Sequence, residues 1–189
     1  MIGWCGLPDI DEEYTNKTVE TGWQHALSLP RKVLIRDGHV CQMPHDEFNE
    51  LRRKKSHILI QGEETIREIG DTFDLELKNA TNNAFTVTID EHLQLLYENG
   101  CFTMSFDDAN ISGGRTERKL LCDQVRKMRV VADTSLLEVY LNDGESVFTT
   151  RFYPNSSSIQ VRSKNCILDV WELVGMSMNI KEEEMGENE

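Results

Sequence analysis

The sequence predicts an all-β fold built around a two-sheet antiparallel β-sandwich. From residue 56 to residue 174, short segments alternate apolar and polar side chains, as between Phe73 and Leu77. Asp37-Gly38 and Asn99-Gly100 stand between such segments, and these dipeptides favour the two-residue turns of β-hairpins. Two facing sheets that turn alternate residues inward would bury much of the 39% of the chain that is apolar.

The elements before the sandwich are a strand, a hairpin and a helix. Residues 23–29 alternate as a strand, and residues 33–36 and 39–43 flank the Asp37-Gly38 turn. Residues 45–55 change period, because Phe48 and Leu51 stand three apart among charged side chains, and this spacing predicts a short linker helix. The basic run Arg52–Lys55 is then expected to be a solvated end of that helix.

The sandwich itself is predicted over residues 56–174. Its expected strands are 58–61, 73–77, 85–89, 93–97, 101–106, 129–132, 136–141, 146–153, 158–161 and 167–173. Residues 175–189 carry five Glu and one Lys with little apolar surface to bury, which predicts a disordered acidic tail.

Composition excludes some classes of partner. The formal net charge of −13 argues against nucleic acid and anionic membranes, because binding to phosphates depends on clustered Lys and Arg. No apolar run approaches the roughly 20 residues that span a bilayer, so no membrane segment is expected. The first residues lack the pattern of a secretory leader, and the five cysteines are widely spaced. Both features favour a cytoplasmic location.

Four segments of the sequence resemble segments found in one enzyme family. They are Ile2-Gly-Trp-Cys-Gly-Leu-Pro-Asp9, Gly22-Trp-Gln-His-Ala-Leu-Ser-Leu-Pro-Arg31, Ile111-Ser-Gly-Gly-Arg-Thr-Glu-Arg-Lys119 and the strand–turn–strand stretch from Met128 to Pro154. In this order they resemble the end of glycoside hydrolase family 32, whose members cleave β-fructofuranosides such as sucrose and sucrose 6-phosphate. The resemblance implies that residues 1–44 are a remnant of the last blade of a five-bladed propeller, ahead of the sandwich.

The resemblance also implies what this chain lacks. In the family the nucleophile, the transition-state stabiliser and the general acid/base are carboxylates of the propeller, and their motifs are absent from this sequence. The chain is therefore expected to be a carboxyl-terminal fragment, inactive alone, of an enzyme acting on sucrose, sucrose 6-phosphate or another β-fructofuranoside. Two alternatives stay open: a lectin-like carbohydrate-binding sandwich, and a structural partner of a separately encoded propeller. The expected partner is thus a propeller domain, in cis or in trans.

Two groups of carboxylates are candidates for chemistry. A retaining glycosidase needs two carboxyl groups about 5–5.5 Å apart, and Asp9, Asp11, Glu12 and Glu13 are clustered in sequence. Neighbouring acids on a Pro-containing loop are usually exposed and independently ionised. Glu138 lies inside the best-matching segment, but it alternates away from Leu137 and Val139, which predicts a solvated strand face. No catalytic residue is therefore predicted.

The remaining candidates also have simpler explanations. Trp4 is a candidate sugar contact, because sugar C–H faces stack on aromatic rings, but a Trp in an apolar strand can equally be core. Cys122 has no histidine in a recognisable pattern to make a thiolate. Ser112–Arg115 lacks the strand–loop–helix setting of a phosphate loop and is expected to connect strands. The five histidines (His25, His39, His45, His57 and His92) lack zinc-ligand spacing, so no metal or cofactor is predicted.

Overall fold

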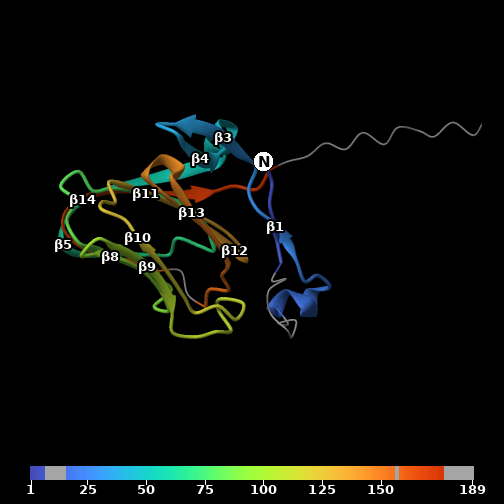
Figure 1. The fold of residues 1–189 in the computed structure, drawn as a ribbon. Coiled ribbons are helices and arrows are strands. Elements are labelled where there is room, and N and C mark those ends of the chain that lie inside the picture. Colours follow the sequence, from blue (N-terminus) through green and yellow to red (C-terminus); the bar gives the residue numbers. More distant parts are fainter. Residues whose placement is uncertain (7–15, 156–157, 177–189) are drawn as a thin grey trace, which may run out of the picture.

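The computed structural model describes residues 1–6, 16–155 and 158–176, and nearly all of their regular structure is β-strand (Figure 1). The leading part contains β1 (Trp4–Cys5), the 3₁₀ helix η1 (Lys17–Thr21), β2 (Ala26–Leu27), β3 (Arg31–Arg36) and β4 (His39–Pro44). A second 3₁₀ helix, η2 (Asp46–Leu51), leads into the sandwich.

The sandwich strands follow η2 without a long interruption. They are β5 (Arg52–Arg67), β6 (Thr72–Lys78), β7 (Phe85–Ile89), β8 (Leu93–Glu98), β9 (Cys101–Phe106), β10 (Glu117–Leu121), β11 (Lys127–Asp133), β12 (Leu136–Leu141), β13 (Ser146–Arg151) and β14 (Ser158–Leu173). A short 3₁₀ turn, η3 (Asn142–Gly144), joins β12 to β13.

The long strand β14 belongs to both layers of the sandwich. Residues 159–163 pair with β7, whereas residues 167–172 pair with β6. The first layer continues in the order β7-β8-β9-β10 and the second in the order β6-β11-β12-β13, and β5 pairs along nearly all of β14. Every pairing is antiparallel, and the two layers face each other (Figure 1). The predicted antiparallel sandwich is confirmed.

A bulge explains how one strand serves two layers. The register of β14 against β5 shifts between Ser163 and Cys166, and Gly62 of β5 faces Ser163 with φ +144°. Bulges bend a strand and increase its twist, so β14 can leave one layer and enter the other. The sequence predicts two strands here, over 158–161 and 167–173, because residues 162–165 are polar. The structure corrects this to one continuous bent strand.

The core lies between the layers. Phe73, Leu75 and Leu77 of β6 point inward, as predicted, and each is at most 1% exposed. From the first layer, Phe102 packs into the same apolar cluster.

The turn between β3 and β4, at Asp37-Gly38, has positive φ at both residues, as a type I′ hairpin turn requires.

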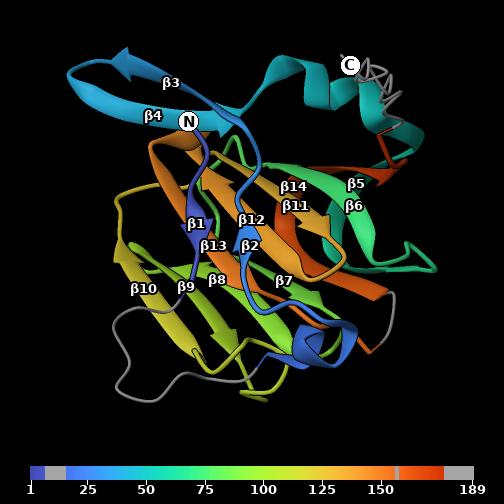
Figure 2. The same cartoon turned by 90° about the vertical axis from the view of Figure 1, so that its right-hand side faces the viewer.

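The leading part lies against the outer face of the second layer. Figure 2 shows β1 and β2 in front of β12 and β13, with the β3–β4 hairpin above them. The strand expected over residues 23–29 is shorter in the structure, because only Ala26–Leu27 pairs with β1. The predicted hairpin is confirmed as β3 and β4.

The linker differs from its prediction. The helix is present but covers only Asp46–Leu51, and Arg52 already begins β5. The basic run is thus the start of a strand and not a helix end, because Arg52 and Arg53 pair with Leu173 and Glu172 of β14. Arg52 is also partly buried, since its guanidinium lies 3.9 Å from the ring centroid of Trp171. Long-range pairing overrides the local helical pattern here.

Candidate functional site

Charged side chains line the outer face of the second layer, and little water reaches them. Alternation along the strands turns apolar residues into the core and leaves Asp74, Arg129, Glu138, Arg151 and Asp169 on the opposite face. Each of these side chains is at most 8% exposed. The leading part and η2 contact Arg129, Glu138 and Arg151, whereas side chains of β5 pair with Asp74 and Asp169. Burying a charge is costly unless it is paired and hydrogen-bonded, so the partners of these groups identify what the face holds.

Glu138 holds the segment that connects β2 to the β3–β4 hairpin. Its carboxylate accepts hydrogen bonds from the backbone N–H of Leu29 at 2.9 Å and from Nε of Arg31 at 3.1 Å. Arg31 Nη2 lies 2.9 Å from the same carboxylate, and Tyr140 donates its hydroxyl to it. Glu138 is 1% exposed, so the predicted solvated strand face is wrong. The alternation identified the correct face but not the segment that covers it.

The environment of this ion pair favours the charged form of Arg31 and the neutral form of Tyr140. Burial opposes the charge on Arg31, but the adjacent Glu138 and the Tyr140 oxygen outweigh it and raise the pKa of Arg31. Burial and the charge of Glu138 raise the pKa of Tyr140. The hydroxyl therefore remains a donor to the carboxylate.

Arg151 holds the other end of the same segment. Its Nη2 donates to the carbonyl oxygen of Gln24 at 2.6 Å, and its Nη1 donates to Ser135 Oγ at 3.2 Å. The guanidinium carbon lies 5.1 Å from the ring centroid of Trp23. Asn16 Nδ2 donates to the Gln24 carbonyl as well, at 3.2 Å. The Gln24 carbonyl oxygen thus accepts hydrogen bonds both from Arg151 of the sandwich and from Asn16 of the leading part.

Glu138 and Arg151 together form what we call the charged clasp. The carboxylate takes a backbone N–H after β2, and the guanidinium takes a backbone C=O before it. The clasp therefore anchors the chain to the sandwich on both sides of β2.

A second network holds the linker. Asp74, fully buried, accepts from Arg129 at 3.0 and 2.6 Å and from Arg52 Nε at 2.7 Å. Arg129 also donates to Asn49 of η2 at 2.9 Å, and Arg52 donates to Glu76. These bonds fix η2 and the start of β5 beside the hairpin.

The loop Ser112–Arg115 packs against Arg151 of the clasp. A Cβ on Gly113, whose φ is +63°, would lie 2.9 Å from both Arg151 Cβ and Asn16 Oδ1. Ser112 is 2% exposed. The loop connects β9 to β10, as predicted, and it also packs between the sandwich and the leading part. Residues of the family-like segments 22–31, 111–119 and 128–154 therefore meet at this interface.

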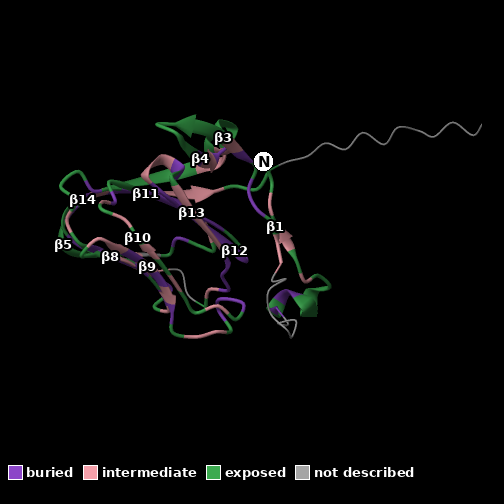
Figure 3. Cartoon of the chain, in the orientation of Figure 1, coloured by how far each residue is buried: buried purple, intermediate pink, exposed green. Residues whose placement is uncertain are grey.

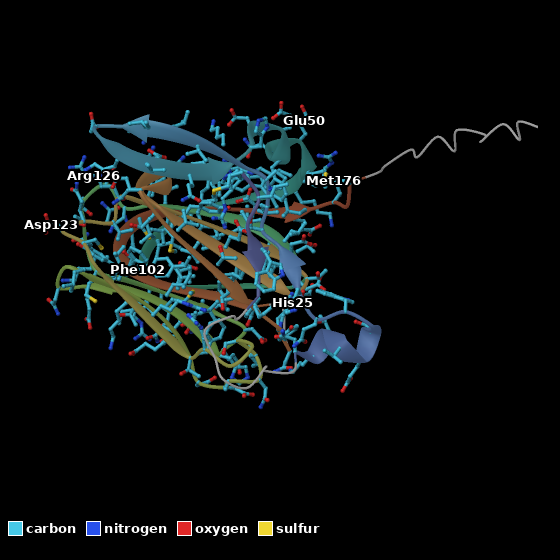
Figure 4. The ribbon with its side chains drawn as sticks, turned by 45° about the vertical axis from the view of Figure 1, so that its right-hand side comes forward. His25, Glu50, Phe102, Asp123, Arg126 and Met176 are labelled. Carbon is cyan, nitrogen blue, oxygen red and sulfur yellow. The ribbon has the colours of Figure 1, made fainter. Side chains whose placement is uncertain are left out.

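Trp4 lies at the surface of the leading part. It is 58% exposed, and its ring packs edge-on against His25 with 4.9 Å between centroids. Figure 4 shows His25 beside β1 and β2. The exposure excludes a core role in the described chain, and sugar contact by Trp4 stays a prediction.

Among the described residues, the other candidates do not come together as a catalytic site. Asp9, Asp11, Glu12 and Glu13 lie outside the described residues, as do residues 177–189 of the expected tail. Burial raises the pKa of the Cys122 thiol, which disfavours the thiolate that a nucleophile needs. In residues 1–6, 16–155 and 158–176, no three His, Cys, Asp or Glu side chains gather as metal ligands. Trp171, the Trp of the sandwich, is stacked against Arg52.

Comparison with known proteins identifies the class. The profile described as "Glycosyl hydrolases family 32 C terminal" matches residues 47–171. The chain therefore belongs to glycoside hydrolase family 32, as the sequence predicted, and the match covers nearly all of η2 and the sandwich.

Individual relatives show which enzymes of the family this chain resembles in sequence. Sucrose-6-phosphate hydrolase of Lactococcus lactis subsp. lactis is 27% identical over 180 residues, which is 91% of this chain and 36% of the relative. The enzyme of the same name from Vibrio alginolyticus is 31% identical over 160 residues, 81% of this chain and 31% of the relative. The chain thus spans about a third of the length of these relatives.

Solved structures show the same fold. Sucrose-6-phosphate hydrolase from Lactobacillus gasseri superposes with a TM-score of 0.77 at 21% identity, over 92% of this chain and 38% of that one. A Bombyx mori GH32 beta-fructofuranosidase gives a TM-score of 0.70 at 17% identity, over 91% and 37%. Because the superposition includes nearly the whole chain, it covers the leading part together with the sandwich.

Proposed function

We propose that this chain is the carboxyl-terminal part of an enzyme that hydrolyses sucrose, sucrose 6-phosphate or a related β-fructofuranoside, and that its role there is structural. The charged clasp carries this proposal. Glu138 and Arg151 use buried charge to hold the backbone of the leading part, and the relatives that share this region are named as sucrose-6-phosphate hydrolases.

The state of the buried carboxylates supports a structural role. Glycoside hydrolysis needs one carboxyl group that can protonate the leaving oxygen and a second that attacks or activates water. Asp74, Glu138 and Asp169 are each engaged by cationic side chains of this chain and are at most 2% exposed. Burial alone would raise the pKa of Asp169, but hydrogen bonds from His57 and Lys55, together with the charges of Lys55 and Lys78, outweigh it and lower that pKa. The Asp169 carboxyl is therefore a poor proton donor.

The proposal extends to partner and location. The catalytic carboxylates come from a propeller that the leading part completes, either in the same polypeptide or in a separate one. All five cysteines are unpaired, which fits a reducing compartment, so we place the protein in the cytoplasm. Among the described residues no helix has the length and apolarity needed to cross a bilayer. Cell fractionation that recovers the protein outside the cytoplasm would contradict this placement.

A chimera tests the proposed function. The part of the Lactococcus lactis sucrose-6-phosphate hydrolase that precedes its match to this chain would be joined to the complete chain, and fructose release from sucrose 6-phosphate would be measured. We expect hydrolysis by the chimera and none by the preceding part alone. A folded, monodisperse chimera that releases no fructose would contradict the proposal.

A further inference from the structure

A groove runs between the β3–β4 hairpin and the second layer of the sandwich. Its wider part, beside the hairpin, has a cavity volume of about 310 Å³, and its narrower part, over β6 and β11, has about 110 Å³. Met43, Arg129 and Asp143 line both parts, so the two are continuous. Figure 3 shows the hairpin on its outer side as a largely exposed ribbon at the edge of the molecule. We call this space the hairpin groove, and its size suits a small molecule.

The floor of the groove places positive charges beside one another. Lys78 of β6 and Lys127 of β11 both line it, and they are direct cross-strand partners, so their side chains lie on the same face of the sheet. Arg129 lies two residues after Lys127 and therefore on that face as well. Like charges directly opposite each other destabilise a sheet. A ligand that carries negative charge would relieve this repulsion.

Arg129 supplies a donor that is held in place. The residue is 8% exposed, its Nε and Nη2 donate to Asp74, and Nη2 also donates to Asn49. Its Nη1 makes no hydrogen bond to any of the described residues. Because a buried carboxylate fixes the guanidinium, and because Arg129 lines both parts of the groove, Nη1 is the nitrogen left to meet a ligand there.

The carboxylate of Asp143 does not cancel the charge on its side of the groove. It lies 3.0 Å from Lys127 Nζ and 3.7 Å from Arg36 Nη1, so one carboxylate serves two cations. Lys127 is 55% exposed. Ion pairs that are open to water contribute little to stability, and the Lys127 ammonium is therefore available to a competing anion.

The other side of the groove has the same imbalance. Asp169 lies 3.5 Å from Lys78 Nζ and 3.0 Å from Lys55 Nζ, so it too is shared by two cations. The remaining carboxylates of the lining, Asp46 and Glu76, each contact a single cation. Each shared carboxylate leaves one positive charge unbalanced, and this excess occurs in a chain whose formal net charge is −13.

A phosphate group has the chemistry that this groove would recognise. It carries up to two negative charges and several acceptor oxygens, and it forms strong charge-assisted hydrogen bonds with Arg and Lys. Leu34, Met43 and Pro44 line the hairpin side and provide an apolar wall for an attached organic group. We propose that the hairpin groove binds the phosphate group of a small molecule, with Lys78, Lys127 and Arg129 Nη1 as the donors.

Titration calorimetry on the complete chain tests this site. The probes are inorganic phosphate, glucose 6-phosphate and glucose, each titrated at about pH 8, where the phosphate group is a dianion and the lysines keep their charge. The double variant Lys78→Gln/Lys127→Gln removes the two opposed charges. The matched control is Lys119→Gln in β10 of the first layer, because Lys119 is 57% exposed and is also ion-paired, with Glu117 at 2.9 Å.

We expect saturable binding of at least one of the two phosphate compounds, weakened at least about tenfold in the double variant and unchanged in Lys119→Gln, because two charge-assisted contacts are lost. The midpoint of chemical denaturation should not fall in the double variant, since the like charges oppose each other in the folded sheet. If the double variant does not fold, Lys127→Gln alone should weaken binding in the same direction.

Tighter binding of glucose 6-phosphate than of inorganic phosphate would support the proposal and identify a phosphate ester as the ligand, held partly by the apolar wall. Equal or tighter binding of inorganic phosphate would support it with free phosphate as the ligand. The proposal would be overturned if neither compound bound saturably, if the folded variants bound as well as the wild type, or if glucose bound as tightly as its phosphate ester.

Discussion

Replacing Glu138 by glutamine removes the charge from the clasp and keeps the shape of the side chain. The variant can still accept the Leu29 N–H, but it leaves the buried guanidinium of Arg31 without its counter-charge. Breaking a buried ion pair by removing one partner costs about 3–5 kcal/mol. Arg31 can reach water once the leading part lifts away, so we expect the lower end, about 3 kcal/mol, as a reduced free energy of local opening.

Amide hydrogen exchange measures that opening directly. At about 1.4 kcal/mol per factor of ten, residues 24–31 should exchange roughly a hundredfold faster in Glu138→Gln than in the wild type. Strand β6, residues 72–78, should keep its protection. The control is Glu172→Gln, which removes an exposed pair with Lys54 and should change exchange by about twofold or less. Unchanged exchange at 24–31, or an equal acceleration in β6, would refute the clasp.

Two further predictions concern the hairpin and the tyrosine beside the clasp. Gly144→Ala should destabilise the protein by at least about 1 kcal/mol more than Gly70→Ala in chemical denaturation. Both glycines have positive φ, but the new Cβ meets backbone atoms only at position 144, where they belong to Gln42. An equal loss of stability in the two variants would contradict this prediction. Because folding raises the pKa of Tyr140, the stability that the hydroxyl contributes is complete below the unfolded value of about 10 and is lost as the pH rises above it. The stability gap between wild type and Tyr140→Phe should therefore shrink between about pH 9 and about pH 11, and a constant or growing gap would count against the proton-donor role.

The sandwich could be predicted from sequence because its pattern is local. Alternation along β6 and β12 assigns the inward residues correctly, and the Asn99-Gly100 dipeptide marks the turn between β8 and β9. β10 was missed, because Glu117–Leu121 has three charged residues and lies at the edge of its layer, where alternation is weak. The bend of β14 depends on pairing with β5 and two other strands, which no local pattern shows.

The clasp could not be predicted, because it joins residues more than 100 positions apart. Alternation predicts that Glu138 turns away from the core, and solvent is then the expected surrounding. The structure covers that face with the leading part, which supplies Leu29 N–H and Arg31. One signal was available: Arg31 and Arg151 both lie inside the family-like segments, as does Glu138, and opposite charges in such segments are candidates for pairing. The local pattern does not say which arginine pairs with the glutamate.

Fructose release by this chain alone tests the central claim most directly. The purified chain, shown to be free of host invertase, would be incubated with sucrose and with sucrose 6-phosphate, and fructose would be measured against a heat-killed control. The account predicts no release above the control, because the proposed function assigns the carboxylate pair of a retaining glycosidase to a part of the enzyme outside this chain. Release that scales with the amount of folded chain would contradict it, since catalysis would then reside in the region that we assign a structural role.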